Sequence, residues 1–166
     1  MTYSIVAVHG LNPTNKEDHA QATWTASNNK MWLKDFLPSQ LPTARILLFG
    51  YNANVAFETS IAGVTEYAEN LLNRLRGKRR VPRTAMTRPI IFVCHSLGGI
   101  ITKKALTIAK LDPTYETIGK AWWVSLLHVA ISVADRKILK LWNCVLCNPA
   151  SRRQLCITGQ HRRIDC

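Results

Sequence analysis

The stretch Ile91-Phe-Val-Cys-His-Ser-Leu-Gly-Gly99 decides the fold of this chain. A continuously apolar run over residues 89–93 predicts a buried strand, and residues 100–110 have the composition of a helix. A Ser-Leu-Gly-Gly turn that joins a strand to a helix is typical of a nucleophile elbow, which holds its serine in a strained backbone conformation. We therefore expect Ser96 to raise its hydroxyl above the carboxyl edge of a parallel sheet.

The residues around Ser96 suit attack on an acyl carbonyl. The positions two residues before and after the serine have to be small, because strand and helix pass close together there. Gly98 meets this requirement, and Cys94 replaces the usual glycine with another small residue. The predicted elbow comprises Cys94, His95, Gly98 and Gly99 around Ser96. The alternative is a tight Ser-Gly turn without chemistry.

Two backbone amides are predicted to stabilise the oxyanion of the reaction. One is the N–H of Leu97 at the start of the elbow helix. The other is the N–H of Leu11, in the turn that His9-Gly10 opens after an apolar run at residues 4–8. We interpret His9 as a structural residue rather than a base, because the proton-accepting histidine comes last in the order serine, acid, histidine.

Strand and helix patterns alternate on both sides of the elbow. Residues 4–8 and 45–49 are short apolar strands, and residues 12–29 are a polar loop anchored by Trp24. A short helix is predicted at residues 31–36, stopped by Pro38. Alternating elements with continuously apolar strands favour a parallel sheet covered on both faces.

A longer amphipathic helix begins after Ser60. Its apolar residues recur at spacings of three and four, at Ile61, Val64, Ala68, Leu71, Leu72 and Leu75. Gly77 and the basic residues after it are predicted to form a loop.

Length and composition indicate one domain with a real core. The chain has 166 residues, of which 47% are hydrophobic and 19% charged. We expect no signal peptide, because no basic segment precedes an apolar one at the start. The longest uncharged run, residues 121–134, is shorter than the about 20 residues of a membrane span, and predicts buried core or an interfacial segment.

The formal net charge of +12 comes from two parts of the chain: residues 1–120 carry 15 Lys and Arg against 8 Asp and Glu, and residues 121–166 carry 7 against 2. Seven of the 22 Lys and Arg residues lie between Arg74 and Arg88. Because no nucleic-acid-binding motif accompanies them, we expect no nucleic-acid partner and interpret the segment as a solvated loop. A surface for anionic lipid or nucleic acid is the alternative.

Several separate motifs, in chain order, resemble the serine-active-site-containing α/β-hydrolases. They are Val8-His9-Gly10-Leu11, Trp24-Thr25, Trp32-Leu33, Asp35-Phe36-Leu37-Pro38, Ala44-Arg45-Ile46, Phe49-Gly50-Tyr51 and the elbow. The resemblance covers residues 2–120 and implies a lipase- or esterase-like acyl hydrolase. Ser96 would be the nucleophile and the amides of Leu11 and Leu97 the oxyanion donors. An ester or lipid-like substrate and no cofactor are implied.

Fungal members of this group often form the esterase-like N-terminal module of larger NACHT- or ankyrin-bearing proteins. Relatives are associated with mitochondrial or endoplasmic-reticulum membranes. The resemblance therefore implies an intracellular protein, either cytoplasmic or peripheral at these membranes.

The composition changes after Lys120. Residues 1–120 are predicted to be the N-terminal part of an α/β-hydrolase domain, a mostly parallel sheet with helices on both faces, incomplete at its C-terminal end. Residues 121–166 are predicted to be a divergent, poorly defined segment. After the elbow helix, members of the family have a Gly-Thr-Pro-His-type turn, which this sequence lacks. One or two further strands fit in the remaining residues, since a βαβ unit takes roughly 30.

The base and acid of a triad have few candidates after Ser96. Histidines are His128 and His161, and acids are Asp112, Glu116, Asp135 and Asp165. The order Ser96, Asp135, His161 has the right sense, whereas His128 lies in an apolar run typical of a buried or interfacial histidine. The four cysteines of the last 23 residues are Cys144, Cys147, Cys156 and Cys166. With His161 they suggest zinc, but their spacing is not that of a zinc ribbon, and we predict no metal.

Without a base the rate of a serine hydrolase falls by about 10⁶-fold. Two functions thus stay open from the sequence: a serine esterase of lipase type, and a non-catalytic interaction or signalling module on a partial hydrolase fold.

Overall fold

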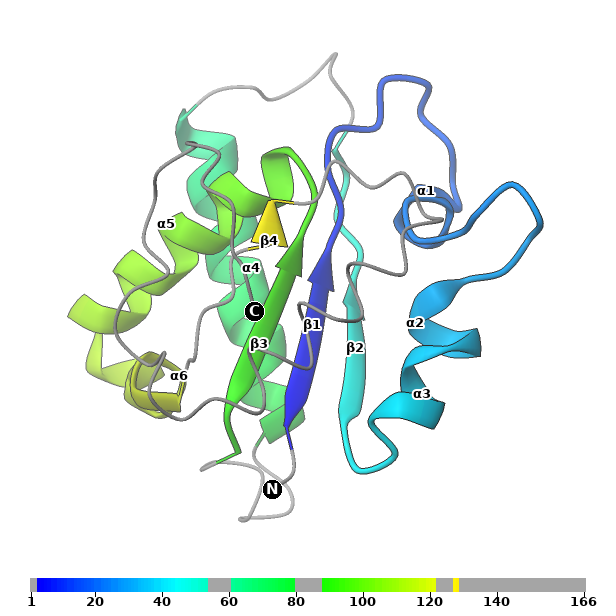
Figure 1. Ribbon diagram of the computed structural model, residues 1–166. Coiled ribbons are helices and arrows are strands. Elements are labelled where there is room, and N and C mark those ends of the chain that lie inside the picture. The colour runs from blue at the N-terminus through cyan, green and yellow to red at the C-terminus, as the bar shows by residue number, and fades with distance from the viewer. Residues whose placement is uncertain (1–2, 54–60, 80–87, 122–126, 129–166) are drawn as a thin grey trace, which may run out of the picture. The chain divides into compact units, whose positions relative to one another are not determined.

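The computed structural model describes residues 3–53, 61–79, 88–121 and 127–128. Its strands form one sheet in the order β2-β1-β3-β4 (Figure 1). They are β1 (Ser4–Val8), β2 (Arg45–Phe49), β3 (Ile90–Cys94) and β4 (Leu127–His128), and neighbouring strands pair in parallel throughout. Val8 pairs with both Phe49 and Cys94, so three strands end level. The loops after them therefore emerge together at one edge of the sheet.

The predicted strands at residues 4–8 and 45–49 are confirmed, and the third lies one residue later than expected. β1 and β3 are buried along their whole length, whereas in β2 only Phe49 is buried and the other four residues are partly exposed. A strand buried on both faces reads as a continuous apolar run.

Two long helices cover one face of the sheet. α4 (Ile61–Arg79) and α5 (Leu97–Leu111) pack against each other and against the sheet (Figure 1). The core between helices and strands includes Val6, Val8, Phe92, Ala68, Leu71, Leu72, Ile101 and Ala105. α5 ends at Leu111 and is capped by Asp112, and a 3₁₀ turn (Pro113–Tyr115) and α6 (Glu116–Ala121) follow it. α5 is therefore held against the sheet by buried side chains, which include Ile101 and Ala105.

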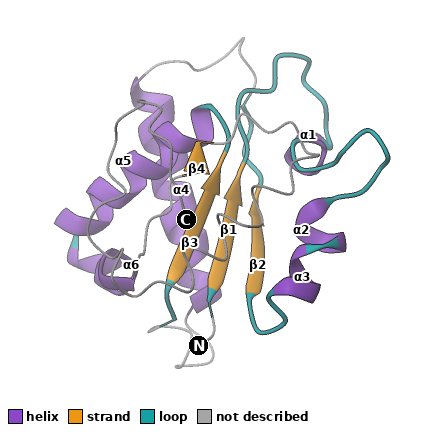
Figure 2. Ribbon diagram, viewed as in Figure 1, coloured by secondary structure: helices purple, strands orange, loops and turns teal. Residues whose placement is uncertain are grey.

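Three short helices lie beside β2 (Figure 2). They are α1 (His19–Ala22), α2 (Trp32–Asp35) and α3 (Leu37–Gln40). Trp24 is fully buried, which confirms its role as the anchor of this segment, although the expected loop contains α1. The prediction that Pro38 stops a helix is wrong in detail: α2 ends at Asp35, and Pro38 lies in the first turn of α3. Proline is accepted there because the first-turn N–H has no helical partner.

The loop predicted from Gly77 onward is also wrong at its start. α4 continues through Gly77 to Arg79. Arg76, Lys78 and Arg79 occupy its last turn, where cations interact favourably with the helix dipole and the exposed carbonyls. Arg79 is buried, and its Nη1 donates to the Arg88 carbonyl at 2.9 Å. Residues 80–87, the rest of the basic segment, lie outside the described residues.

Within the described ranges, no helix is both long and apolar enough to cross a bilayer. Most of the uncharged run at residues 121–134, and nearly all of the segment predicted to diverge, lies outside those ranges. The part of it that is described, β4, pairs with Val93 and Cys94 of β3.

Candidate active site

Ser96 occupies a strained turn between β3 and α5. Its φ of 49° and ψ of −121° are those of a positive-φ residue, a region that a side chain with a Cβ rarely adopts. Ser96 is exposed, whereas all five residues of β3 are buried. The turn is closed by N–H donation from Gly98 to the His95 carbonyl and from Gly99 to the Ser96 carbonyl, both at 2.9 Å. The predicted strand, turn and helix of an elbow are thus present, with the serine raised at the carboxyl edge.

Gly98 lets α5 approach the end of β1. A Cβ on this residue would lie 2.4 Å from the carbonyl oxygens of both Val8 and His9. Real Cβ atoms essentially never approach backbone atoms so closely. The requirement for a small residue two positions after the serine is therefore steric, and its origin is β1.

Cys94 fits the position before the elbow as a buried structural residue. Its Sγ lies 3.2 Å from Oγ1 of Thr102, which donates to the Gly98 carbonyl at 2.8 Å. Because that hydroxyl proton is already used, the thiol is the donor of the pair. Burial raises the pKa of Cys94 to about 11, so the thiol stays protonated near neutral pH. These two hydrogen bonds connect β3 to α5, and a glycine at position 94 has no side chain to form the first of them.

The turn after β1 lies against the serine. A Cβ on Gly10 would lie 2.8 Å from Cβ of Ser96 and 2.7 Å from Nδ1 of His95. The His95 N–H donates to the Val8 carbonyl at 2.9 Å, which ties the elbow to β1. Leu11 follows Gly10 directly, and Leu97 follows Ser96. Among the described residues neither of these two amides donates a backbone hydrogen bond, and their role as oxyanion donors stays a prediction.

His9 is buried and both of its ring nitrogens are engaged. Nδ1 lies 2.8 Å from the Gly10 carbonyl, and Nε2 lies 3.3 Å from the Tyr51 N–H. Burial, with smaller contributions from His19 and His95, lowers the pKa of His9 below 6.5. A neutral imidazole with no free nitrogen is a structural group, as expected from its place before the serine.

Of the candidate triad Ser96, Asp135 and His161, the structure describes Ser96. Asp135 and His161 lie outside the described residues, as do Cys144, Cys147, Cys156 and Cys166. His128 belongs to β4, where its backbone pairs with Cys94. The acid and base therefore stay predictions. In the described part of the chain, no group of three His, Cys, Asp or Glu residues could hold a metal ion.

Sequence reasoning named Tyr51 only within the motif Phe49-Gly50-Tyr51 and gave it no role, but this residue contacts the site from the segment after β2. Its hydroxyl donates to the His9 carbonyl at 2.9 Å, and its ring stacks on the His9 ring with centroids 4.2 Å apart. A signal was available: Tyr51 follows the strand at residues 45–49 by two positions, so it belongs to the carboxyl edge on which His9 lies.

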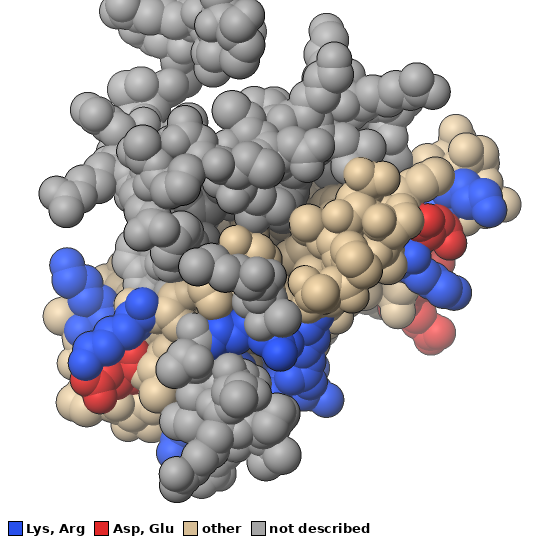
Figure 3. Space-filling model, turned by 60° about the horizontal axis from the view of Figure 1, so that its bottom comes forward, with Lys and Arg blue, Asp and Glu red and all other residues tan. Residues whose placement is uncertain are grey.

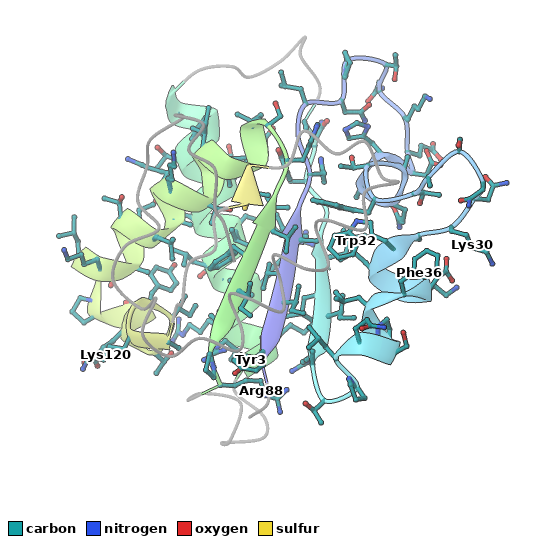
Figure 4. The ribbon with its side chains drawn as sticks, in the orientation of Figure 1. Tyr3, Lys30, Trp32, Phe36, Arg88 and Lys120 are labelled. Carbon is teal, nitrogen blue, oxygen red and sulfur yellow. The ribbon has the colours of Figure 1, made fainter. Side chains whose placement is uncertain are left out.

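The face drawn in Figure 3 carries Lys and Arg side chains at its middle and at both sides, and some basic residues lie at the end of the strands opposite to Ser96. Tyr3 and Arg88 lie there together, at the amino ends of β1 and β3 (Figure 4). Arg45 begins β2, and its Nη1 donates to the Lys78 carbonyl at 2.9 Å. Arg45 and Arg88 therefore lie at the end of the sheet opposite to Ser96.

A cavity of about 440 Å³ lies between β2 and the second half of α4. Its walls are mainly apolar, with Leu47, Phe49, Leu71 and Leu75 among them. None of the residues around Ser96 lines it. The cavity is separate from the candidate active site.

A parallel sheet with helices packed against it, and a strained serine between its third strand and the next helix, define the class as an α/β-hydrolase-like protein. The family described as Putative serine esterase (DUF676) matches residues 3–163, and the chain belongs to this family. The match extends beyond Lys120 to nearly the end of the sequence.

One relative is Protein SERAC1 of Danio rerio. It is 32% identical to this chain over 91 residues, which are 54% of this chain and 14% of that protein. The matched part is therefore a small piece of its relative. The resemblance noted from the sequence motifs is confirmed, and membership supports a hydrolase-like function in general terms.

Proposed function

We propose that this protein is a serine esterase in which Ser96 is the nucleophile. The observation that supports this most is the backbone of Ser96, an exposed serine held at positive φ on the carboxyl edge of a buried strand. Strain of this kind costs about 1–3 kcal/mol and persists where the surroundings impose it, commonly at active sites. Here Gly10 and Gly98 supply the space that this conformation needs.

In the proposed reaction, Oγ of Ser96 attacks the carbonyl carbon of an ester while its proton passes to a base. The amides of Leu11 and Leu97 stabilise the negative charge on the carbonyl oxygen. The C–O bond to the alcohol then breaks, the base returns the proton to the leaving alcohol, and water hydrolyses the acyl-serine. We assign the base to His161 and the acid that orients it to Asp135, by the chain order of serine, acid and histidine.

The surface next to Ser96 favours an aliphatic acyl group. Leu11 is 37% exposed and follows Gly10, and Ile100 is 56% exposed one helical turn after Ser96. Exposed leucine and isoleucine in the two segments that meet at Ser96 can bury a hydrocarbon chain, at about 25 cal/mol per Å² of apolar surface removed from water. We therefore propose esters of medium or long acyl chains as substrates, including lipid-like esters.

Labelling with a fluorophosphonate probe tests the nucleophile. Wild-type protein should label covalently and Ser96→Ala should not. Ser39→Ala is the matched control, since Ser39 is an exposed serine whose hydroxyl donates to the Phe36 carbonyl in α3. Labelling that persists in Ser96→Ala, or fails in wild type, would contradict the proposal.

Hydrolysis of p-nitrophenyl esters with two, eight and sixteen carbon atoms in the acyl group tests the substrate class. We expect kcat/KM to rise with chain length, and the double variant Leu11→Ser, Ile100→Ser to remove the increase. His161→Ala should reduce kcat by orders of magnitude, because an alcohol without a base is a poor nucleophile. Equal rates for all three esters would contradict the apolar acyl site.

Failure to label or hydrolyse would favour the other function left open by the sequence, a non-catalytic interaction module. The membrane association and the intracellular location also stay predictions. Imaging the protein in its own cells beside mitochondrial and endoplasmic-reticulum markers would test both.

A further inference from the structure

Tyr51 makes three separate contacts with His9, although the two residues are 42 positions apart in the sequence. Its backbone N–H donates to Nε2 of His9 at 3.3 Å, and its hydroxyl donates to the His9 carbonyl at 2.9 Å. The two rings stack with an interplanar angle of 13°. A residue held at its ring nitrogen, at its ring face and at its backbone carbonyl has little freedom to move.

These contacts determine where the single imidazole proton of His9 lies. The Tyr51 N–H can only donate, so Nε2 must be the unprotonated nitrogen. The Gly10 carbonyl can only accept, so Nδ1 carries the proton and donates to it at 2.8 Å. One neutral tautomer satisfies both hydrogen bonds.

The second of these bonds orients the peptide group that joins Gly10 to Leu11. In a trans peptide the carbonyl and the N–H point in opposite directions. With the Gly10 carbonyl turned to the His9 ring, the Leu11 N–H points away from that ring. The same peptide is next to the nucleophile, since Gly10 packs against Ser96.

We propose that Tyr51 is a positioning residue that acts through His9 to hold the Leu11 amide in the oxyanion site beside Ser96. This inference rests on the proposed function. Tyr51 does not touch the reacting atoms; it holds a histidine, and the histidine holds the amide.

Neighbouring aromatic rings restrict the position of the Tyr51 side chain. Phe49 stacks on its ring at 5.5 Å between centroids, and the Tyr67 ring from α4 lies 4.9 Å away. On the other side of the site, the His19 ring meets the His9 ring edge-on at 5.2 Å. His9 is therefore enclosed between β2 and α1, and its position depends on elements far from it in sequence.

Tyr51→Phe tests the proposal because it removes only the hydroxyl. We expect kcat for ester hydrolysis to fall about 10-fold with KM nearly unchanged, which is less than the 10²–10³-fold loss for deleting an oxyanion donor outright. Tyr115→Phe is the matched control: Tyr115 is buried, and its hydroxyl donates to Oδ1 of Asn73 at 2.8 Å, outside the site. Equal kcat values for wild type and Tyr51→Phe would overturn the proposal.

A pair of His9 variants separates positioning from packing. His9→Leu keeps much of the volume but has no donor for the Gly10 carbonyl, whereas the side-chain amide of His9→Asn can replace Nδ1–H. We expect about a 100-fold loss of kcat in His9→Leu and partial recovery in His9→Asn. A purely structural role predicts that activity follows stability, so thermal unfolding is measured for both. Activity that follows Tm alone would overturn the proposal.

Nitrogen-15 NMR gives a readout that needs no enzymatic activity. In wild type, His9 should show a protonated Nδ1 and an unprotonated Nε2. Tyr51→Phe should shift the amide resonance of Leu11, and Tyr115→Phe should not. A proton on Nε2, or an unchanged Leu11 resonance, would overturn the proposal. If wild type neither labels nor hydrolyses, the proposed function fails, while these spectra still decide whether Tyr51 holds the Leu11 amide.

Discussion

Replacing Ser96 by glycine should stabilise this protein while removing its nucleophile. At φ 49° and ψ −121° the Ser96 backbone is strained because of its Cβ, and glycine adopts such angles without strain. Ser96→Ala removes the same hydroxyl but keeps the Cβ and therefore the strain. The comparison of the two variants isolates the backbone conformation from the chemistry of the serine.

The expected difference follows from two opposing effects. Relief of strain at one such residue contributes about 1–3 kcal/mol to the free energy of unfolding. Glycine also makes the unfolded chain more flexible than alanine does, which costs about 0.4–1 kcal/mol. Ser96→Gly should thus be more stable than Ser96→Ala by about 0.5–2 kcal/mol. For a domain of this size the shift in Tm is about 2–4 °C for each kcal/mol.

Urea denaturation and differential scanning calorimetry measure this difference. Position 39 provides the control, since Ser39 is exposed within the helix α3. There glycine should be less stable than alanine, by up to about 1 kcal/mol, because helical angles favour alanine. A Ser96→Gly variant that is no more stable than Ser96→Ala would refute the assignment of strain to Ser96, and with it the main support for a nucleophile.

Three further predictions follow from the same region. Gly98→Ala should lower the free energy of unfolding by about 1–3 kcal/mol, because its Cβ would lie 2.4 Å from two backbone oxygens. Calorimetry tests this, with Gly77→Ala as the control, since a Cβ at Gly77 meets nothing within 4 Å. Equal effects of the two substitutions would refute the prediction. His9 has a pKa below 6.5 when folded, so the unfolded chain binds its proton first as the pH falls. Stability from His9 should be complete above about pH 6.5 and lost as the pH falls through the folded pKa. Urea titrations from pH 7.5 to 4.5 should show a smaller decline for His9→Asn than for wild type, and parallel curves would contradict this. Cys94 is buried and its pKa is raised to about 11, so it should react with iodoacetamide at pH 8 only after unfolding. Mass spectrometry of the Cys94 peptide measures the modification. Modification of the native protein at the rate of a free thiol would contradict the prediction.

Much of the architecture could be predicted from local patterns. The strands β1 and β2 were predicted at their observed bounds, and the turn at Ser96 was predicted from the residues that surround it. These features depend on short-range rules: a continuous apolar run makes a buried strand, and a Ser-Leu-Gly-Gly turn between strand and helix leaves few backbone conformations. Errors arose where a local rule was applied without its context. Gly77 was expected to end α4, but the helix continues, because a single exposed glycine weakens a helix without breaking it.

The sequence by itself determined which residue is the candidate nucleophile, since the elbow is encoded by consecutive residues. Only the tertiary structure decided what surrounds it. The order β2-β1-β3-β4 puts the turn after β1 against Ser96, and it brings Tyr51 from the end of β2 onto His9. The physical reason is the separation along the sequence of the residues that determine each feature. Turn geometry is set within a few residues, whereas a hydrogen bond across 42 residues exists only after parallel strands have paired with their carboxyl ends level.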